Sequence, residues 1–269
     1  MNDLLRELAP VSEEAWKQIE DEARRTLKRM LAARKLVDFK GPLGWHASAV
    51  NLGRSERVAI QAGQGVEARL RRVQPLVEIR VPFELAREEL ETIGRGAEDA
   101  DLDSVRDAAR KAAVVEDHAV FEGYAQIGMR GIAEAAASGV LTISDDYTQY
   151  PALVAEAVSN LHGAGVGGPY AIALGPRCYT GLTKTTHNGF PVIDHVRKLV
   201  DGPIVWAPAL MGAAVISQRG GDFELTVGQD FSIGYLEHSA TAVRLYLQES
   251  FTFRVLTPEA AVALRYPKR

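Results

Sequence analysis

Histidine and cysteine, the side chains that most often ligate metals or act as nucleophiles, are few and widely spaced in this chain. No two histidines form an H-x-x-x-H or H-E-x-x-H pattern, so the spacing typical of a metal site is absent. Cys178 is the only cysteine, which excludes an intrachain disulfide and a thiolate zinc cluster. The six histidines are His46, His118, His162, His187, His195 and His238.

The densest group of possible ligands surrounds His118. Glu116 and Asp117 precede it, and Glu122 follows one helical turn later, a spacing that could bind a metal weakly. A solvated helix face or an intersubunit salt bridge is the favoured interpretation, because most charged helix residues have these roles.

Residues 163–168, with the sequence GAGVGG, satisfy the pattern G-x-G-x-x-G of dinucleotide-binding loops. In such a loop the glycines follow a strand and begin a helix, whose amides then face a pyrophosphate. Here they follow a predicted helix and lead through Pro169 into a predicted strand. This order predicts a helix stop and a turn, not a nucleotide site.

A nucleophilic site has equally little support. The chain lacks the G-x-S-x-G elbow, and Cys178 stands between Arg177 and Tyr179 without a base nearby in sequence. Asp194 and His195 could approach it only through the tertiary fold, so a structural role for Cys178 is favoured.

Glu249 interrupts a strand face that is otherwise apolar, within a predicted strand that ends near residue 255. Residues 223–235 alternate in the same way, and the two segments together predict a long antiparallel pair. A charge at position 249 needs a partner such as an arginine, and a structural or interface ion pair is favoured over a general base. The apolar face comprises Val243, Leu245, Leu247, Phe251, Phe253 and Val255.

Two longer helices are expected before this strand pair. Ser12 can cap a helix that carries Glu13 and Glu14 in its first turn. Residues 103–137 contain no proline and predict one long helix that stops at Gly139. The apolar face of the first helix comprises Trp16, Ile19, Ala23, Leu27, Met30 and Leu31.

Between and after these helices the pattern changes. Residues 50–81 mix short alternating runs with Gly53, Gly63 and Gly65, which predicts a protruding hairpin with a glycine-rich tip. Residues 140–218 interleave short helices with short strands. The predicted strands are 170–174, 204–206 and 213–217, and the predicted helices are 151–161, 176–186 and 192–200.

Composition narrows the function classes. The chain has 269 residues, 46% of them hydrophobic and 25% charged, as expected for a folded globular protein. A net charge of -4 and a pI of about 5.9 argue against a nucleic-acid partner held through phosphates. Residues 1–7 lack the apolar core of a signal peptide, and no apolar run approaches the roughly 20 residues of a membrane span. No membrane partner and a cytoplasmic location are expected.

Several sequence blocks, taken together, resemble the shell proteins of encapsulin nanocompartments. The similarity runs in order over about residues 4–266. The matching blocks are residues 8–10, 33–38, 41–45, 75–80, 82–85, 116–117, 121–123, 168–170, 200–202, 219–235 and 249–253.

This resemblance implies an α+β fold, that of the tailed-phage major capsid proteins. Such a protein has a peripheral domain with a long spine helix, an extended loop and an apical domain. The peripheral domain would comprise residues 1–47, 82–136 and 222–255, and the extended loop residues 48–81. Residues 137–221 and 256–269 would form the apical domain.

The resemblance also implies a function. Encapsulin shell proteins self-assemble into hollow icosahedral compartments, and sixty copies would close the smallest such shell. Each compartment encloses cargo, such as a ferritin-like protein or a dye-decolourising peroxidase, through a targeting peptide on the cargo. Roles in iron storage or in the response to oxidative stress follow from such cargo. The shell itself is not a catalyst.

By the same resemblance, the cargo peptide would lie in a groove on the inner surface, between the first helix and the strand after Gly228. Apolar peptide residues would fill the groove while Arg34 and Asp38 fix the register. The alternative is that Leu27, Leu36 and Ile233 belong simply to the core. The matching positions are Leu27, Arg34, Leu36, Asp38, Asp230, Phe231 and Ile233.

Two further expectations concern the opening of the shell and a cofactor. His187, Asn188, Gly189 and Phe190 match the loop around the five-fold opening, where His187 could make the charge depend on pH. A flexible loop without a gating role is the alternative. Some encapsulins hold a flavin against a tryptophan near position 87, but this chain has Arg87 followed by Glu88, so no cofactor is expected.

Two other classes of protein compete with the compartment shell. A major capsid protein of a tailed phage or prophage is the first, but such proteins commonly carry an N-terminal scaffolding or cleaved segment. Here the capped helix already starts at Ser12, which favours the compartment. A soluble hydrolase or nucleotide-binding enzyme is the second, and it lacks a coherent site in the sequence.

Overall fold

The computed structural model describes residues 4–59 and 66–267. Its α-helices are α1 (Glu13–Met30), α2 (Arg87–Gly94), α3 (Asp103–Phe121), α4 (Ile132–Ala135), α5 (Tyr150–Gly163), α6 (Pro176–Lys184) and α7 (Val192–Arg197). Its 3-10 helices are η1 (Arg6–Leu8), η2 (Ala33–Lys35), η3 (Ala125–Ile127), η4 (Tyr147–Gln149) and η5 (Pro258–Ala260).

One five-stranded sheet is organised around β15, a strand of 14 residues. Antiparallel strands β13 and β14 pair with its two halves, β4 pairs antiparallel with its other edge, and β1 adds to β13 in parallel. The pair predicted from the alternating residues is thereby confirmed. The strands are β1 (Asp38–Lys40), β4 (Val77–Ala86), β13 (Phe223–Val227), β14 (Ser232–His238) and β15 (Ala242–Val255).

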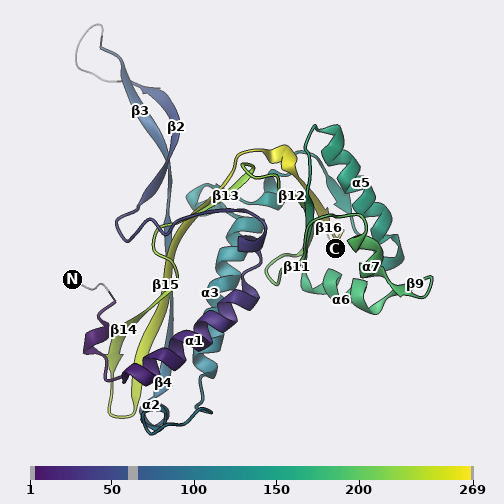
Figure 1. Ribbon diagram of the computed structural model, residues 1–269. Coiled ribbons are helices and arrows are strands. Elements are labelled where there is room, and N and C mark those ends of the chain that lie inside the picture. Colours follow the sequence, from purple (N-terminus) through teal and green to yellow (C-terminus); the bar gives the residue numbers. More distant parts are fainter. Residues whose placement is uncertain (1–3, 60–65, 268–269) are drawn as a thin grey trace.

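Helices α1 and α3 pack against each other and cover one face of this sheet (Figure 1). The alternation of β15 directs Val243, Leu245 and Leu247 into the same core as the apolar face of α1. Ser12 caps α1 as predicted, because its hydroxyl accepts a hydrogen bond from the Ala15 amide at 3.2 Å. Glu249 follows Leu247 by two residues on β15, so its side chain lies on the same face of the sheet. The fold therefore places this carboxylate in the interface between the helices and the sheet.

A second five-stranded sheet forms the other lobe, with α5, α6 and α7 beside it (Figure 1). Strands 170–174 and 204–206 were predicted with their observed bounds, and β12 begins one residue earlier than predicted. Helices α6 and α7 end earlier than predicted, at Lys184 and Arg197. In sheet order the strands are β11 (Ile204–Trp206), β8 (Tyr170–Leu174), β12 (Gly212–Ser217), β16 (Ala261–Arg265) and β7 (Val140–Thr142).

The antiparallel hairpin of β2 (Ala49–Val58) and β3 (Ala68–Pro75) extends away from both lobes (Figure 1). It confirms the predicted protruding hairpin. Gly53 has φ +68° where the strand register shifts between Asn51 and Ser55. The predicted tip glycines, Gly63 and Gly65, lie outside the described residues.

The helix predicted over residues 103–137 is wrong in its second half. Helix α3 ends at Phe121, and a small hairpin of β5 (Gly123–Tyr124) and β6 (Met129–Arg130) follows before the short α4. Gly123 has φ +95°, which an α-helix does not allow, and the backbone of Gly131 packs directly on that of Gly123. Absence of proline was therefore insufficient evidence for one continuous helix.

The domain boundaries remain a prediction. All five strands of the second sheet lie within residues 137–221 and 256–269, and the hairpin lies within 48–81. Strand β4 crosses the predicted boundary at residue 82, because it begins at Val77. The mixture of helix-covered sheets is the α+β class that the sequence predicts. In the described part of the chain, no helix has the length and apolar character needed to cross a membrane.

Candidate functional site

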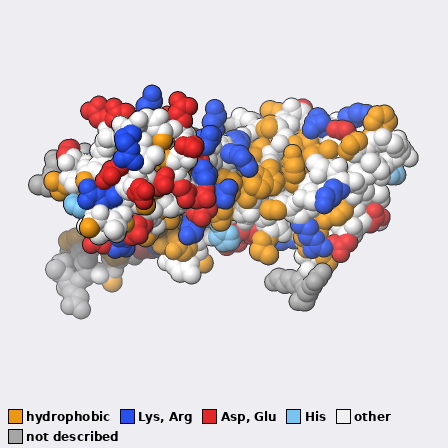
Figure 2. Space-filling view, turned by 90° about the horizontal axis from the view of Figure 1, so that it is seen from below, with side chains coloured by type: hydrophobic (Ala, Val, Ile, Leu, Met, Phe, Trp, Pro, Cys, Tyr) orange, Lys and Arg blue, Asp and Glu red, His pale blue; other side chains and the backbone are white. Residues whose placement is uncertain are grey.

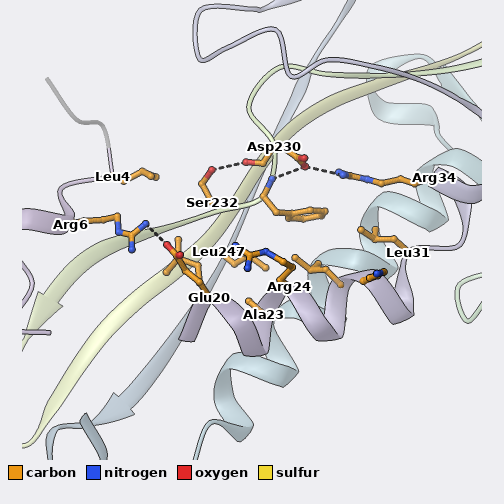
Figure 3. Close-up of a pocket in the computed structure, with 14 residues that line it drawn as sticks. Leu4, Arg6, Glu20, Ala23, Arg24, Leu31, Arg34, Asp230, Ser232 and Leu247 are labelled. Atoms are coloured by element: carbon orange, nitrogen blue, oxygen red, sulfur yellow. Dashed lines mark hydrogen bonds and ion pairs between the residues drawn. The ribbon is translucent and has the colours of Figure 1, made fainter. Parts of the chain in front are cut away.

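A groove of about 530 Å³ runs between α1 and β14 (Figure 3). The amphipathic α1 supplies one wall, and the residues that lead into and form β14 supply the other. The groove is lined by Leu4, Arg6, Glu20, Ala23, Arg24, Leu27, Lys28, Leu31, Arg34, Asp230, Phe231, Ser232, Ile233 and Leu247.

Most of the predicted cargo-site residues line this groove. Leu27 and Ile233 are only 8% and 4% exposed, so they serve both as core residues and as the floor of the groove. A place in the core and a place in the proposed peptide groove are therefore compatible for Leu27 and Ile233. Phe231 is half-buried beside them. Arg34 and Asp230 supply the charged end of the groove.

Leu36 and Asp38 do not line this groove. They lie at a smaller neighbouring cavity of about 120 Å³, and Arg34 lines both cavities. Leu36 is 3% exposed and packs in the larger core cluster, which joins the second lobe to β13 and β15. The Asp38 carboxylate accepts a hydrogen bond from the Gly221 amide at 2.6 Å, which ties β1 to the turn before β13.

The guanidinium of Arg34 connects three carboxylates. Its Nε and Nη2 donate to Glu116 at 2.9 and 2.6 Å, and its Nη1 contacts Asp230 at 2.9 Å. Nη2 also donates to Glu249, which confirms the arginine partner expected for that residue. Figure 3 shows Arg34 and Asp230 facing each other at the end of the groove.

Burial and the neighbouring charges act in opposite directions on the pKa of Arg34 but in the same direction on that of Glu249. Burial by itself would lower the pKa of the Arg34 guanidinium, but the hydrogen bond and charge of Glu116, with Glu249, raise it above its ordinary value. Burial, reinforced by Glu116, raises the pKa of Glu249 well above the usual glutamate range. A planar guanidinium with several donors suits this position better than an ammonium group would.

The interpretation of residues 116–122 as a solvated helix face is wrong for two of the acids. Glu116 and Asp117 are 0% exposed, because α3 turns them toward η2 and β15. Asp117 accepts hydrogen bonds from the amides of Ala32 and Ala33 at 2.8 and 3.0 Å. These bonds hold the segment that carries Arg34 against α3.

The other two residues of this group, His118 and Glu122, do not join the buried cluster. Glu122 forms an ion pair with Arg265 at 2.6 Å, whereas His118 is exposed. Among residues 4–59 and 66–267, no group of three or more His, Cys, Asp or Glu side chains could hold a metal ion. The weak metal site considered for this helix therefore has no geometric support in the described residues.

The end of the groove nearest the N-terminus was not predicted from the sequence. The Leu4 carbonyl accepts a hydrogen bond from the Tyr235 amide at 2.8 Å, so the N-terminal segment lies along the outer edge of β14. Arg6 pairs with Glu20 at 2.5 Å across this end (Figure 3). The Arg6 guanidinium also stacks on Trp16. No local motif in the sequence links these residues, which come from separate elements.

Charged side chains of both signs are interspersed on the lobe that carries the groove. Figure 2 shows this on the face seen from below, whereas hydrophobic side chains gather toward the other lobe. On α1, Arg24 pairs with Asp21 and Arg25 with Glu22, within one helical turn in each case. The Arg24–Asp21 pair is exposed on both sides and adds little stability, whereas Glu22 of the second pair is buried.

Cys178 is fully buried in the second lobe, where its sulfur lies 3.3 Å from the Tyr266 hydroxyl. Burial raises the pKa of the Cys178 thiol, which opposes formation of the nucleophilic thiolate. The predicted structural role agrees with these contacts. His195 lies elsewhere, since its Nε2 is 3.2 Å from the His187 carbonyl oxygen.

The two remaining motifs are a loop and a glycine run. His187 and Phe190 pair across a tight turn in which Asn188 and Gly189 have φ +50° and +82°. Phe190 is 62% exposed, and the role of this loop at an opening stays a prediction.

Helix α5 ends at Gly163, and the glycine run that follows leads to β8, which confirms the predicted helix stop.

The fold matches capsid-like particles of known structure. A virus-like particle from Pyrococcus furiosus aligns with a TM-score of 0.60 at 16% identity, over 93% of this chain and 99% of that one. The capsid of Myoviridae phage XM1 aligns with a TM-score of 0.52 at 10% identity, over 87% and 90% of the two chains. At such identities the likeness shows the fold alone, which is that of the tailed-phage capsid proteins.

Sequence similarity is far higher within one branch of this fold. Residues 1–252 match the Linocin_M18 family, described as encapsulating protein for peroxidase. The type 1 encapsulin shell protein of Rhodospirillum rubrum is 57% identical, over 98% of this chain and 97% of that protein. The one from Mycobacterium tuberculosis is 46% identical, over 99% and 100%. The chain therefore belongs to the encapsulin shell protein family.

Proposed function

We propose that this protein self-assembles into a hollow icosahedral compartment and encloses a cargo enzyme. The observation that carries the proposal is full-length similarity, at up to 57% identity among the relatives compared, to type 1 encapsulin shell proteins. The extended hairpin β2–β3 supports it, since a two-stranded arm needs a neighbouring surface to be stable. Sixty copies would form the smallest closed shell.

Electron microscopy of the purified protein tests assembly directly. We expect uniform hollow spheres and elution at megadalton size, whereas particles no larger than a tetramer would end the proposal. A phage capsid protein would also assemble, so the cargo assay below separates that alternative.

We further propose that the groove between α1 and β14 binds the targeting peptide of the cargo. Leu27 and Ile233 form an apolar floor, Phe231 can pack on an apolar peptide side chain, and Arg34 with Asp230 offers a charged end. The peptide would continue past Arg34 to Asp38 in the neighbouring cavity, because Arg34 lines both. A peroxidase is the favoured cargo class, as the family description indicates.

Replacing Asp38 with arginine should reduce cargo loading, because it reverses a charge proposed to fix the register of the peptide. The shell is co-expressed with a dye-decolourising peroxidase that carries its targeting peptide, and haem absorbance per particle is measured. We expect at least about a tenfold loss. The same peroxidase without its peptide gives the background.

The matched control is Asp21→Arg, which places the same charge on an exposed part of α1 outside the lining of the groove. Undiminished loading by Asp38→Arg particles would remove Asp38 from the site. Equal loading of the peroxidase with and without its peptide would refute peptide-directed encapsulation.

The loop of His187, Asn188, Gly189 and Phe190 is proposed to line an opening of the shell. Its exposed position at a tight turn supports this assignment. Helix α2 begins at Arg87, which is followed by Glu88. That no flavin is held by a tryptophan at this position also stays a prediction.

A further inference from the structure

Two buried carboxylates from different elements meet at one guanidinium. Glu116 comes from α3 and Glu249 from β15, and both side chains are 0% exposed. The Arg34 side chain is 18% exposed and reaches from them to Asp230, which is 42% exposed in the groove. Arg34 therefore connects a buried acidic pair with the surface proposed to bind peptide.

The hydrogen bonds around Glu249 are incomplete for an ionised carboxylate. Its Oε1 accepts from Arg34, but its Oε2 is buried without a hydrogen-bond partner among the described residues. Leaving a charged oxygen unsatisfied in the interior is costly. A protonated carboxylic acid instead carries an O–H donor, which needs only an acceptor nearby.

Glu116 supplies that acceptor. Both carboxylates accept from the same nitrogen, Nη2 of Arg34, which places their oxygens side by side and allows a hydrogen bond between them. Two carboxyl groups can form such a bond only when one of them holds a proton. Glu116 takes a bidentate contact with Arg34, in which Nε donates to Oε1 at 3.1 Å and Nη2 donates to Oε2 at 2.6 Å, the fork geometry that suits an ionised carboxylate.

We propose that Glu249 is protonated in the folded subunit and that its O–H donates a hydrogen bond to ionised Glu116, and that this pair positions Arg34 at the end of the groove. Only one buried negative charge then opposes the guanidinium, so Nη1 stays directed at Asp230 and the groove. The link to cargo rests on the proposed function, whereas the shared proton does not.

Ionisation of Glu249 would change the position of Arg34. A second buried negative charge attracts the guanidinium away from Asp230 and from the groove. The groups that face Glu249 are Arg34 from η2, Glu116 from α3 and Asp230 from the segment before β14. Glu116 and Lys35 in turn act on Asp117. Peptide binding should therefore weaken as the pH rises far enough to ionise Glu249.

The sign of the stability change follows from the same proton. A carboxyl group whose pKa is higher in the folded state binds a proton that the unfolded chain has already released. The contribution of Glu249 to stability is therefore greatest at low pH and falls as the pH rises from the ordinary glutamate range through the folded pKa of Glu249. Burial also raises the pKa of Asp117 to about 7, and this residue adds its own decline in the same direction.

Infrared spectroscopy of assembled shells tests the proton without reference to cargo. Wild-type particles at neutral pH should show a carboxylic acid carbonyl band, and Glu249→Gln particles should lose one component of it while the contribution of Asp117 remains. The melting temperature of Glu249→Gln should also fall less steeply with pH than that of the wild type. Identical spectra and pH profiles for the two proteins would overturn the proposal.

Glu116→Gln is the matched control, since it makes the same chemical change on the partner carboxylate. Glutamine can mimic a protonated Glu249 but cannot replace the charge of Glu116. In particles that assemble, peroxidase loading should stay within about twofold of wild type for Glu249→Gln and fall about tenfold for Glu116→Gln. An equal loss for both variants would mean that Glu249 is ionised.

The loading experiment and the infrared experiment test the cargo function and the shared proton separately. If wild-type particles load no peroxidase through its peptide, the proposed function fails while the infrared comparison still decides the shared proton. If the acid band is absent, the shared proton is refuted even when loading is normal.

Discussion

Replacing Arg34 with alanine is expected to lower the melting temperature of the purified protein by about 10 °C. The change removes the single guanidinium that pairs with buried Glu116 and Glu249. Breaking a buried ion pair by removing one partner typically costs about 3–5 kcal/mol, because the other charge is left uncompensated. Differential scanning calorimetry of the assembled particles measures the shift.

Arg24→Ala provides the control for that experiment. Arg24 also lines the groove, but its side chain is 71% exposed and its partner Asp21 is 56% exposed. An exposed pair of this kind contributes less than about 1 kcal/mol, so the melting temperature should change little. A large shift for Arg24→Ala, or none for Arg34→Ala, would contradict the assignment of the buried cluster as the stabilising feature.

Replacing Gly131 with alanine is expected to destabilise the subunit by about 3 kcal/mol or more. A Cβ at position 131 would lie 2.3 Å from the Gly123 nitrogen and 2.4 Å from the Glu122 carbonyl carbon. These are backbone atoms, which cannot turn aside as a flexible side chain could. The variant should either fail to accumulate as particles or melt well below the wild type.

Gly128→Ala is the comparison that isolates this close contact. Gly128 lies in the same small hairpin with φ +69°, yet a Cβ there would meet no atom within 4 Å. Only the backbone penalty of about 1 kcal/mol is expected. An equal loss of stability in both variants would contradict this explanation. The end of α3 would then depend on backbone conformation, and not on the close approach of Gly131 to Gly123.

The elements that the sequence predicted correctly depend on local periodicity. The cap at Ser12, the apolar face of α1 and the alternation along β13 and β15 are set by neighbours within a few residues. The strand Tyr170–Leu174 was equally clear, because its apolar run is bounded by Pro169 and Gly175. Periodicity also showed that Glu249 lies on an apolar face and needs a partner.

The groove was predicted less completely. Leu27, Arg34, Asp230, Phe231 and Ile233 were placed through resemblance and do line one groove. Leu36 and Asp38 were assigned to the same groove but lie at a neighbouring cavity, because β1 pairs with β13 and Asp38 bonds to the Gly221 amide. Arg6 and Glu20 were missed, since only the folded chain brings them together.

By itself, the sequence determined the capped first helix, the strand pair around β15, the protruding hairpin and, through resemblance, the shell protein family. Tertiary structure alone decided where α3 ends and which carboxylates surround Arg34. Gly123 and Gly131 approach each other only in the hairpin, and Arg34 meets Glu249 across 215 positions of the chain. Amphipathic periodicity is a property of neighbouring residues, whereas the pairing of a buried charge depends on contacts between distant segments that form only on folding.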